Sequence, residues 1–71
     1  MNVLGFTVTS AIESACCKRM RAGWFTASMI EYRAHKAGAP LIVCDSIADR
    51  LIQRERKAGH IVRHGKGWLP V

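Results

Sequence analysis

Hydrophobic positions recur at helical spacing in three segments of the chain, and the first covers residues 10–22. Ser10 and Glu13 have the spacing of a capping box, which predicts that this helix begins at Ser10. Residues 3–8, before it, are predicted to form a short extended segment. The side chains that share one face of the helix are Ile12, Ala15, Cys16 and Met20.

A second helix is predicted to begin at Thr26 or Ser28 and to end by Ala37. Ser28 and Glu31 provide a second capping box. The inner face is predicted to comprise Met29, Ile30 and the methylene stem of Arg33, with Ala34 and Ala37 allowing close packing.

The third helix is predicted to start with Asp45 as its N-cap and to end near Ala58, before Gly59. Residues 41–43 form a short apolar run, either a buried turn or the first residues of this helix. The docking side is predicted to contain Ile47, Ala48, Leu51 and Ala58. The opposite side carries a polar stripe of Ser46, Arg50, Gln53 and Lys57.

The C-terminal residues have the pattern of a β-hairpin. Two β-prone runs, residues 60–63 and 68–71, flank a turn segment that contains two glycines. Pro70 suits an edge strand or a strand end. Trp68 is expected to pack the hairpin onto the helices, and the other expected core aromatics are Trp24, Phe25 and Phe6.

The size and composition indicate one small folded domain spanning residues 1–71, mainly α within the α+β class. A hydrophobic content of 49% argues against disorder. No stretch approaches the roughly 18 consecutive apolar residues of a membrane span, and the first nine residues do not have the pattern of a secretory signal. We therefore expect a cytoplasmic protein without membrane partners.

The charge balance points to a polyanionic partner. Eleven Lys and Arg residues oppose five Asp and Glu residues, which gives a formal net charge of +6. On so small a body this produces a strong positive field, and nucleic acid phosphates are its natural partner.

Three helices followed by a basic, glycine-tipped hairpin resemble the winged helix-turn-helix family of DNA-binding domains. Residues 26–37 correspond to the first helix of the motif and residues 45–58 to the recognition helix, and residues 57–69 (KAGHIVRHGKGWL) look like the wing. The resemblance implies a small bacterial, phage or prophage regulator that binds double-stranded DNA. The chain departs from the family in one place, because the turn between the last two helices looks longer than usual and contains Pro40.

In this interpretation helix 45–58 enters the major groove and residues 60–71 form the wing. Arg50 would pair with guanine and Gln53 with adenine, and Ser46 would bind a phosphate at the helix N-terminus. Arg54, Arg56 and Lys57 would lie close to backbone phosphates. Arg63, His64 and Lys66 of the wing would reach phosphates or the adjacent minor groove.

The same residues allow two other interpretations. A polar helix face is often simply solvated, and a basic winged helix can also bind an acidic protein. An exposed apolar patch at residues 41–43 would favour a protein partner or a dimer interface. The sequence leaves open whether the chain dimerises, which site it reads, and whether it activates, represses or assists excision.

Catalysis, cofactors and metal binding are not expected. Cys16, Cys17 and Cys44 have no framework spacing and are expected to be thiols packed as small hydrophobes. His60 and His64 have zinc-like spacing but no matching cysteine pair. No nucleophile elbow, phosphate loop or acidic pair is present, so an enzyme is not predicted.

Overall fold

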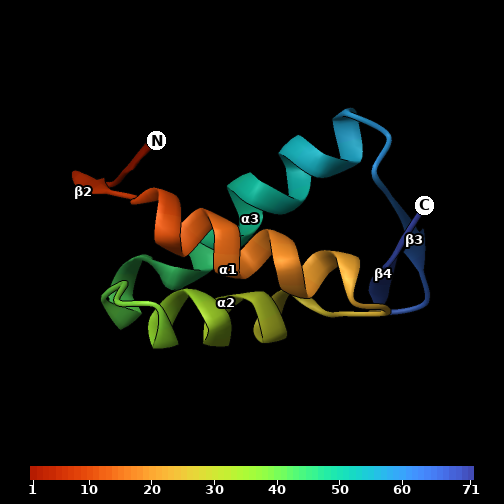
Figure 1. The fold of residues 1–71 in the computed structure, drawn as a ribbon, viewed down its shortest axis with the longest axis horizontal. Coiled ribbons are helices and arrows are strands. Elements are labelled where there is room, and N and C mark those ends of the chain that lie inside the picture. Colours follow the sequence, from red (N-terminus) through yellow and green to blue (C-terminus); the bar gives the residue numbers. More distant parts are fainter.

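A computed structural model describes all residues, 1–71, as three helices between two small hairpins (Figure 1). This confirms a mainly helical α+β fold with a C-terminal antiparallel hairpin, a layout consistent with a winged helix. The elements in chain order are β1 (Asn2–Val3), β2 (Phe6–Thr7), α1 (Ser10–Arg21), α2 (Ala27–Lys36), α3 (Leu41–Lys57), β3 (Ile61–His64) and β4 (Gly67–Pro70). No helix is long and apolar enough to cross a membrane.

The N-terminal extended segment is a hairpin that leads into α1. Strands β1 and β2 pair antiparallel across a turn in which Leu4 and Gly5 both have positive φ. Helix α1 is then capped by Thr9, whose Oγ1 accepts a hydrogen bond from the amide of Ile12 at 3.3 Å. The helix begins at Ser10 as predicted, but its cap is Thr9 and not Ser10, because Thr9 is the last extended residue and its hydroxyl reaches the amide three positions ahead.

Helix α2 begins immediately after Thr26, which is extended but makes no side-chain cap. Ser28 lies inside the helix, so the predicted capping box with Glu31 does not form at this terminus. The buried positions are Ile30 and Ala34, whereas Met29 and Arg33 face solvent. The predicted inner face therefore included two residues, Met29 and Arg33, that lie outside the side of the helix that contacts the core.

Helix α3 begins at Leu41, directly after the extended Pro40. Residues 41–43 are therefore the first turn of the helix, and the predicted N-cap at Asp45 is wrong. Proline disfavours a helical conformation in the residue before it, so it separates the turn from the helix that follows. The helix ends at Lys57, and Gly59 follows with a φ of 81°, a conformation that glycine adopts without steric cost.

The core lies between the three helices, and its largest fully buried side chains come from all of them. Ile47, Ala48 and Leu51 of α3 are buried as predicted, whereas Ala58 is exposed because the helix has already ended. Val3 closes the core at the N-terminal hairpin.

The C-terminal hairpin closes the other end, with Trp68 nearly buried as predicted. It pairs from Ile61 with Pro70 to His64 with Gly67. A β-bridge between Phe25 and Trp68 joins it to the segment between α1 and α2. Gly67 is required here, because a Cβ at this position would overlap the carbonyl oxygen of Phe25 and the ring of Trp24.

Candidate nucleic-acid interface

The second and third helices are joined by four residues, Ala37 to Pro40. Gly38 accommodates the change of direction with a φ of 115°. The expected departure from the winged helix-turn-helix pattern therefore disappears, because turns of three or four residues are usual in this motif. The apparent excess length came from placing the start of α3 four residues too late.

The predicted polar stripe of α3 lies on the side of the helix away from the core. Arg50 and Lys57 are exposed, and Ser46 and Gln53 are half-buried. Gln53 is not entirely free, because its Oε1 accepts a hydrogen bond from Nε of Arg56 at 3.0 Å. Its amide nitrogen makes no hydrogen bond, so the side chain keeps its donors for an outside acceptor.

Ser46 lies in the second turn of α3 and not at its N-terminus. The prediction that a phosphate at Ser46 would also bind the free amides of the helix N-terminus is therefore wrong. The amides that lack partners within a helix belong to its first turn. Here the first turn consists of apolar residues and Cys44. A phosphate contact at Ser46 would have to come from the hydroxyl alone.

Arg54 points toward α1 and not along the stripe. Its Nη1 lies 2.7 Å from Oε1 of Glu13, and its Nη2 lies 3.4 Å from Sγ of Cys17. The hydrogen bond to Glu13 raises the pKa of Arg54 further above its ordinary value. This pair connects α1 to α3, so the structure separates Arg54 from the other predicted contacts.

Two tryptophans contact the wing residues, one from the segment between α1 and α2 and one within the hairpin itself. Nε1 of Trp24 donates a hydrogen bond to the carbonyl oxygen of His64 at 3.0 Å. The guanidinium of Arg63 lies over the Trp68 ring, 5.1 Å from its centroid. Trp24 is 39% exposed, so its assignment to the core is wrong, and it packs against the hairpin instead.

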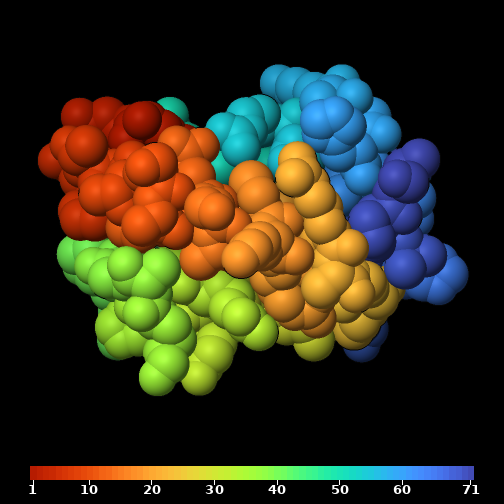
Figure 2. Space-filling view, viewed as in Figure 1, coloured from red at the N-terminus to blue at the C-terminus, as the bar shows by residue number.

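The three predicted wing contacts lie together at the exposed end of this hairpin. Arg63, His64 and Lys66 are all exposed, and Lys66 occupies the β3–β4 turn beside Gly65. Figure 2 shows the hairpin projecting beside the end of α3 at one end of the molecule. The chain passes directly from the basic end of α3 into the wing, and the β3–β4 turn that carries Lys66 lies beside Trp24 of the α1–α2 segment.

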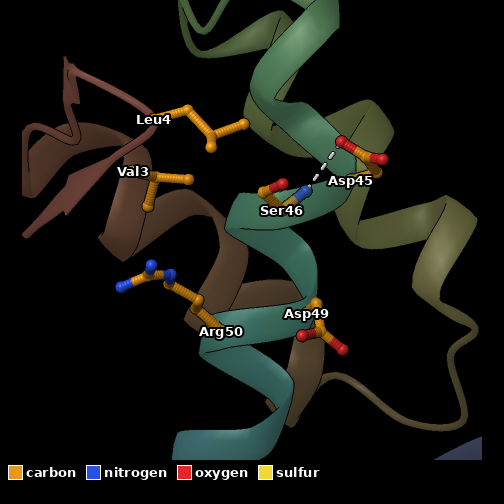
Figure 3. A pocket seen from close by; sticks show the side chains of 6 residues that line it. All are labelled: Val3, Leu4, Asp45, Ser46, Asp49 and Arg50. Atoms are coloured by element: carbon orange, nitrogen blue, oxygen red, sulfur yellow. Dashed lines mark hydrogen bonds between the residues drawn. The ribbon is translucent and has the colours of Figure 1, made fainter.

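Two acidic residues that were not predicted to belong to the site also lie on α3. Asp45 and Asp49 are exposed and form no ion pair. With Ser46 and Arg50, and with Val3 and Leu4 of the N-terminal hairpin, they line a shallow hollow of about 330 Å³ (Figure 3). The predicted reader Arg50 thus has carboxylates in the same hollow.

A buried carboxylate was also missed. Glu55 is only 6% exposed, and its Oε2 lies 3.0 Å from Nδ1 of His60. Its Oε1 accepts a weak hydrogen bond from Cys17 and lies 4.0 Å from Arg21. The spacing from Ile47 and Leu51, four residues at each step, places Glu55 on the docking side and was the available signal.

Burial alone would raise the pKa of Glu55, but the hydrogen bond with His60 and the charge of Arg54 outweigh it and leave the pKa lowered. The carboxylate is therefore ionised at neutral pH. It connects α3 to α1 and to the residue that leads into the wing.

The cysteines are free thiols. Burial raises the pKa of Cys16 to about 11 and also raises those of Cys17 and Cys44, so all three are protonated at neutral pH. No group of three or more His, Cys, Asp and Glu side chains is arranged to hold a metal ion.

No protein-family model matches the chain, and no similar protein was found among curated sequences or solved structures.

Proposed function

We propose that the chain is a winged helix-turn-helix protein that binds double-stranded DNA. The outer stripe of α3 would face the major groove, and the hairpin would lie against the neighbouring backbone. The proposed role is that of a small transcriptional regulator in the cytoplasm, acting by binding and without catalysis.

One observation carries this proposal: the chain from Arg50 onward contains a single acidic residue, Glu55, and that residue is buried and paired. The same segment supplies six cationic side chains from the end of α3 and the wing. Only three residues separate Lys57 from β3, so the basic end of the helix and the wing follow one another directly in the chain. Those cationic residues are Arg50, Arg56, Lys57, Arg63 and Lys66, together with Arg54, whose charge is paired with Glu13 of α1.

The salt dependence of duplex binding tests the electrostatic part of this proposal. We expect fluorescence anisotropy with a labelled duplex to give a log–log salt slope of roughly −4 to −5, as for about four to six neutralised phosphates. Binding that is absent at low salt, or that is unaffected by salt, would rule the proposal out.

Sequence specificity is tested by two single substitutions on the stripe. Selection from random duplexes first gives the preferred sequence. Arg50→Ala and Gln53→Ala should then each reduce discrimination between that sequence and random DNA by about 1–3 kcal/mol. Lys18→Ala, an exposed cation on α1, is the matched control and should leave discrimination unchanged. If both stripe variants discriminate like the wild type, α3 does not read bases.

A protein partner is favoured by a different part of α3. Leu41 and Ile42 are exposed, as expected for a protein contact, although Val43 is buried. These residues precede the basic region, so a protein contact there is compatible with DNA binding at the other end of the helix.

A further inference from the structure

The start of α3 carries an exposed surface that is both apolar and acidic. Leu41 is 72% exposed and Ile42 is 82% exposed, and the two side chains are adjacent in the first turn of the helix. Asp45 and Asp49 follow at helical spacing and have no cationic partner. We call Leu41, Ile42, Asp45 and Asp49 the α3 patch.

The outer side of α2 carries the complementary combination. Tyr32 is 59% exposed, with Met29 beside it. Arg33 and Lys36 are exposed and form no ion pair, and Nζ of Lys36 lies 5.8 Å from the Tyr32 ring centroid. We call Met29, Tyr32, Arg33 and Lys36 the α2 patch.

We propose that these two patches form a homodimer interface, with the α3 patch of one copy against the α2 patch of the other. Two α3 patches facing each other would bring four carboxylates together, which disfavours that arrangement. The crossed arrangement instead places Asp45 and Asp49 opposite Arg33 and Lys36, with apolar side chains between them. Each patch thus meets the opposite charge, and its apolar side chains meet the apolar side chains of the other patch.

The position of the patches in the fold permits a closed dimer. They lie on consecutive helices on either side of the four-residue turn. A two-fold axis near this turn lets each copy contribute both patches, as in an isologous interface. The interface uses nothing from Arg50 onward, so the proposal does not depend on DNA binding.

Self-association of the protein without DNA tests the proposal. Sedimentation velocity from micromolar to millimolar protein should show a monomer–dimer equilibrium that weakens as salt is raised. The double variants Asp45→Lys/Asp49→Lys and Arg33→Glu/Lys36→Glu should each weaken association by about tenfold or more. All four side chains are exposed, and thermal melts of each variant verify that it is folded.

A mixture of the two charge-reversed variants provides the decisive measurement. Each contact in the mixed dimer again joins opposite charges, so association should return to near the wild-type strength. Arg56→Glu/Lys57→Glu changes the net charge by the same amount as the α2 double variant but lies outside both patches, and it should associate like the wild type. A wild-type chain that stays monomeric at millimolar concentration, or a mixture that fails to associate, overturns the proposal.

Discussion

The two halves of α3 share one buried side but differ completely on the other. From Leu41 to Asp49 the exposed residues are apolar or acidic, whereas from Arg50 to Lys57 they are basic or amide. Burial recurs with the helical period along the entire length, which keeps both halves on the same core. The helical period determines which positions are buried, but it does not determine the charge of the exposed side chains. One continuous helix can therefore present two surfaces suited to different partners.

The largest loss of stability should follow from a substitution on the buried side of α3, which both halves share. Leu51→Ala removes a fully buried side chain and should lower the free energy of unfolding by about 2–5 kcal/mol, measured by urea denaturation. Leu41→Ala makes the same chemical change at an exposed position and should stay within about 0.5 kcal/mol of the wild type. Equal losses at the two positions would show that α3 does not begin as described.

The buried carboxylate of the basic half should have the next largest effect. Glu55→Gln should cost about 1–3 kcal/mol at neutral pH, because a buried, charge-assisted hydrogen bond is weakened. The lowered pKa of Glu55 means that its contribution is present above the unfolded-state pKa and is lost as pH falls through the folded value. The difference between variant and wild type should therefore shrink below about pH 4.5, the ordinary value. A difference that is constant from pH 7 to pH 3 would show that the charge of Glu55 contributes nothing.

The wing extends the basic half and should affect DNA affinity without affecting specificity. Arg63→Ala/Lys66→Ala should weaken binding roughly tenfold or more and make the salt slope shallower by about two. The loss should be equal on preferred and random duplexes, because phosphate contacts position the protein without reading sequence. A thermal melt is needed as a control, since Arg63 also lies over Trp68. A loss confined to the preferred duplex would mean that the wing reads bases.

The smallest expected effect concerns the acidic half. Asp45→Asn/Asp49→Asn should strengthen duplex binding about two- to fivefold, because two exposed negative charges near the phosphates are removed. Anisotropy at nanomolar protein measures this change where self-association is negligible. Unchanged affinity would indicate that this half of α3 stays away from the DNA.

The helices were predictable from the sequence because each has a periodic apolar side. The start of α1 at Ser10 and the N-cap position of Thr26 were predicted as well, but the good capping residues Ser10, Ser28 and Asp45 are not N-caps. Pro40 was the better signal for the start of α3, because a proline ends the preceding turn and can stand directly before a helix.

The candidate site was less predictable, because two of its features depend on contacts between distant segments. Arg54 is paired with Glu13, which is 41 residues away, and no local pattern reveals that pairing. Trp24 was assigned to the core by its size, but its indole N–H is bonded to the wing. In both cases the sequence gives the residue, but the direction of its side chain depends on contacts that only the fold creates.

The hairpin contacts also determine what can be observed optically. The chain has two tryptophans, and both lie at the wing, with Trp24 bonded to His64 and Trp68 within β4. The three helices contain no tryptophan. Tryptophan emission from this protein therefore originates at the wing, where detachment of the hairpin changes the environment of both fluorophores while the helices contribute no signal.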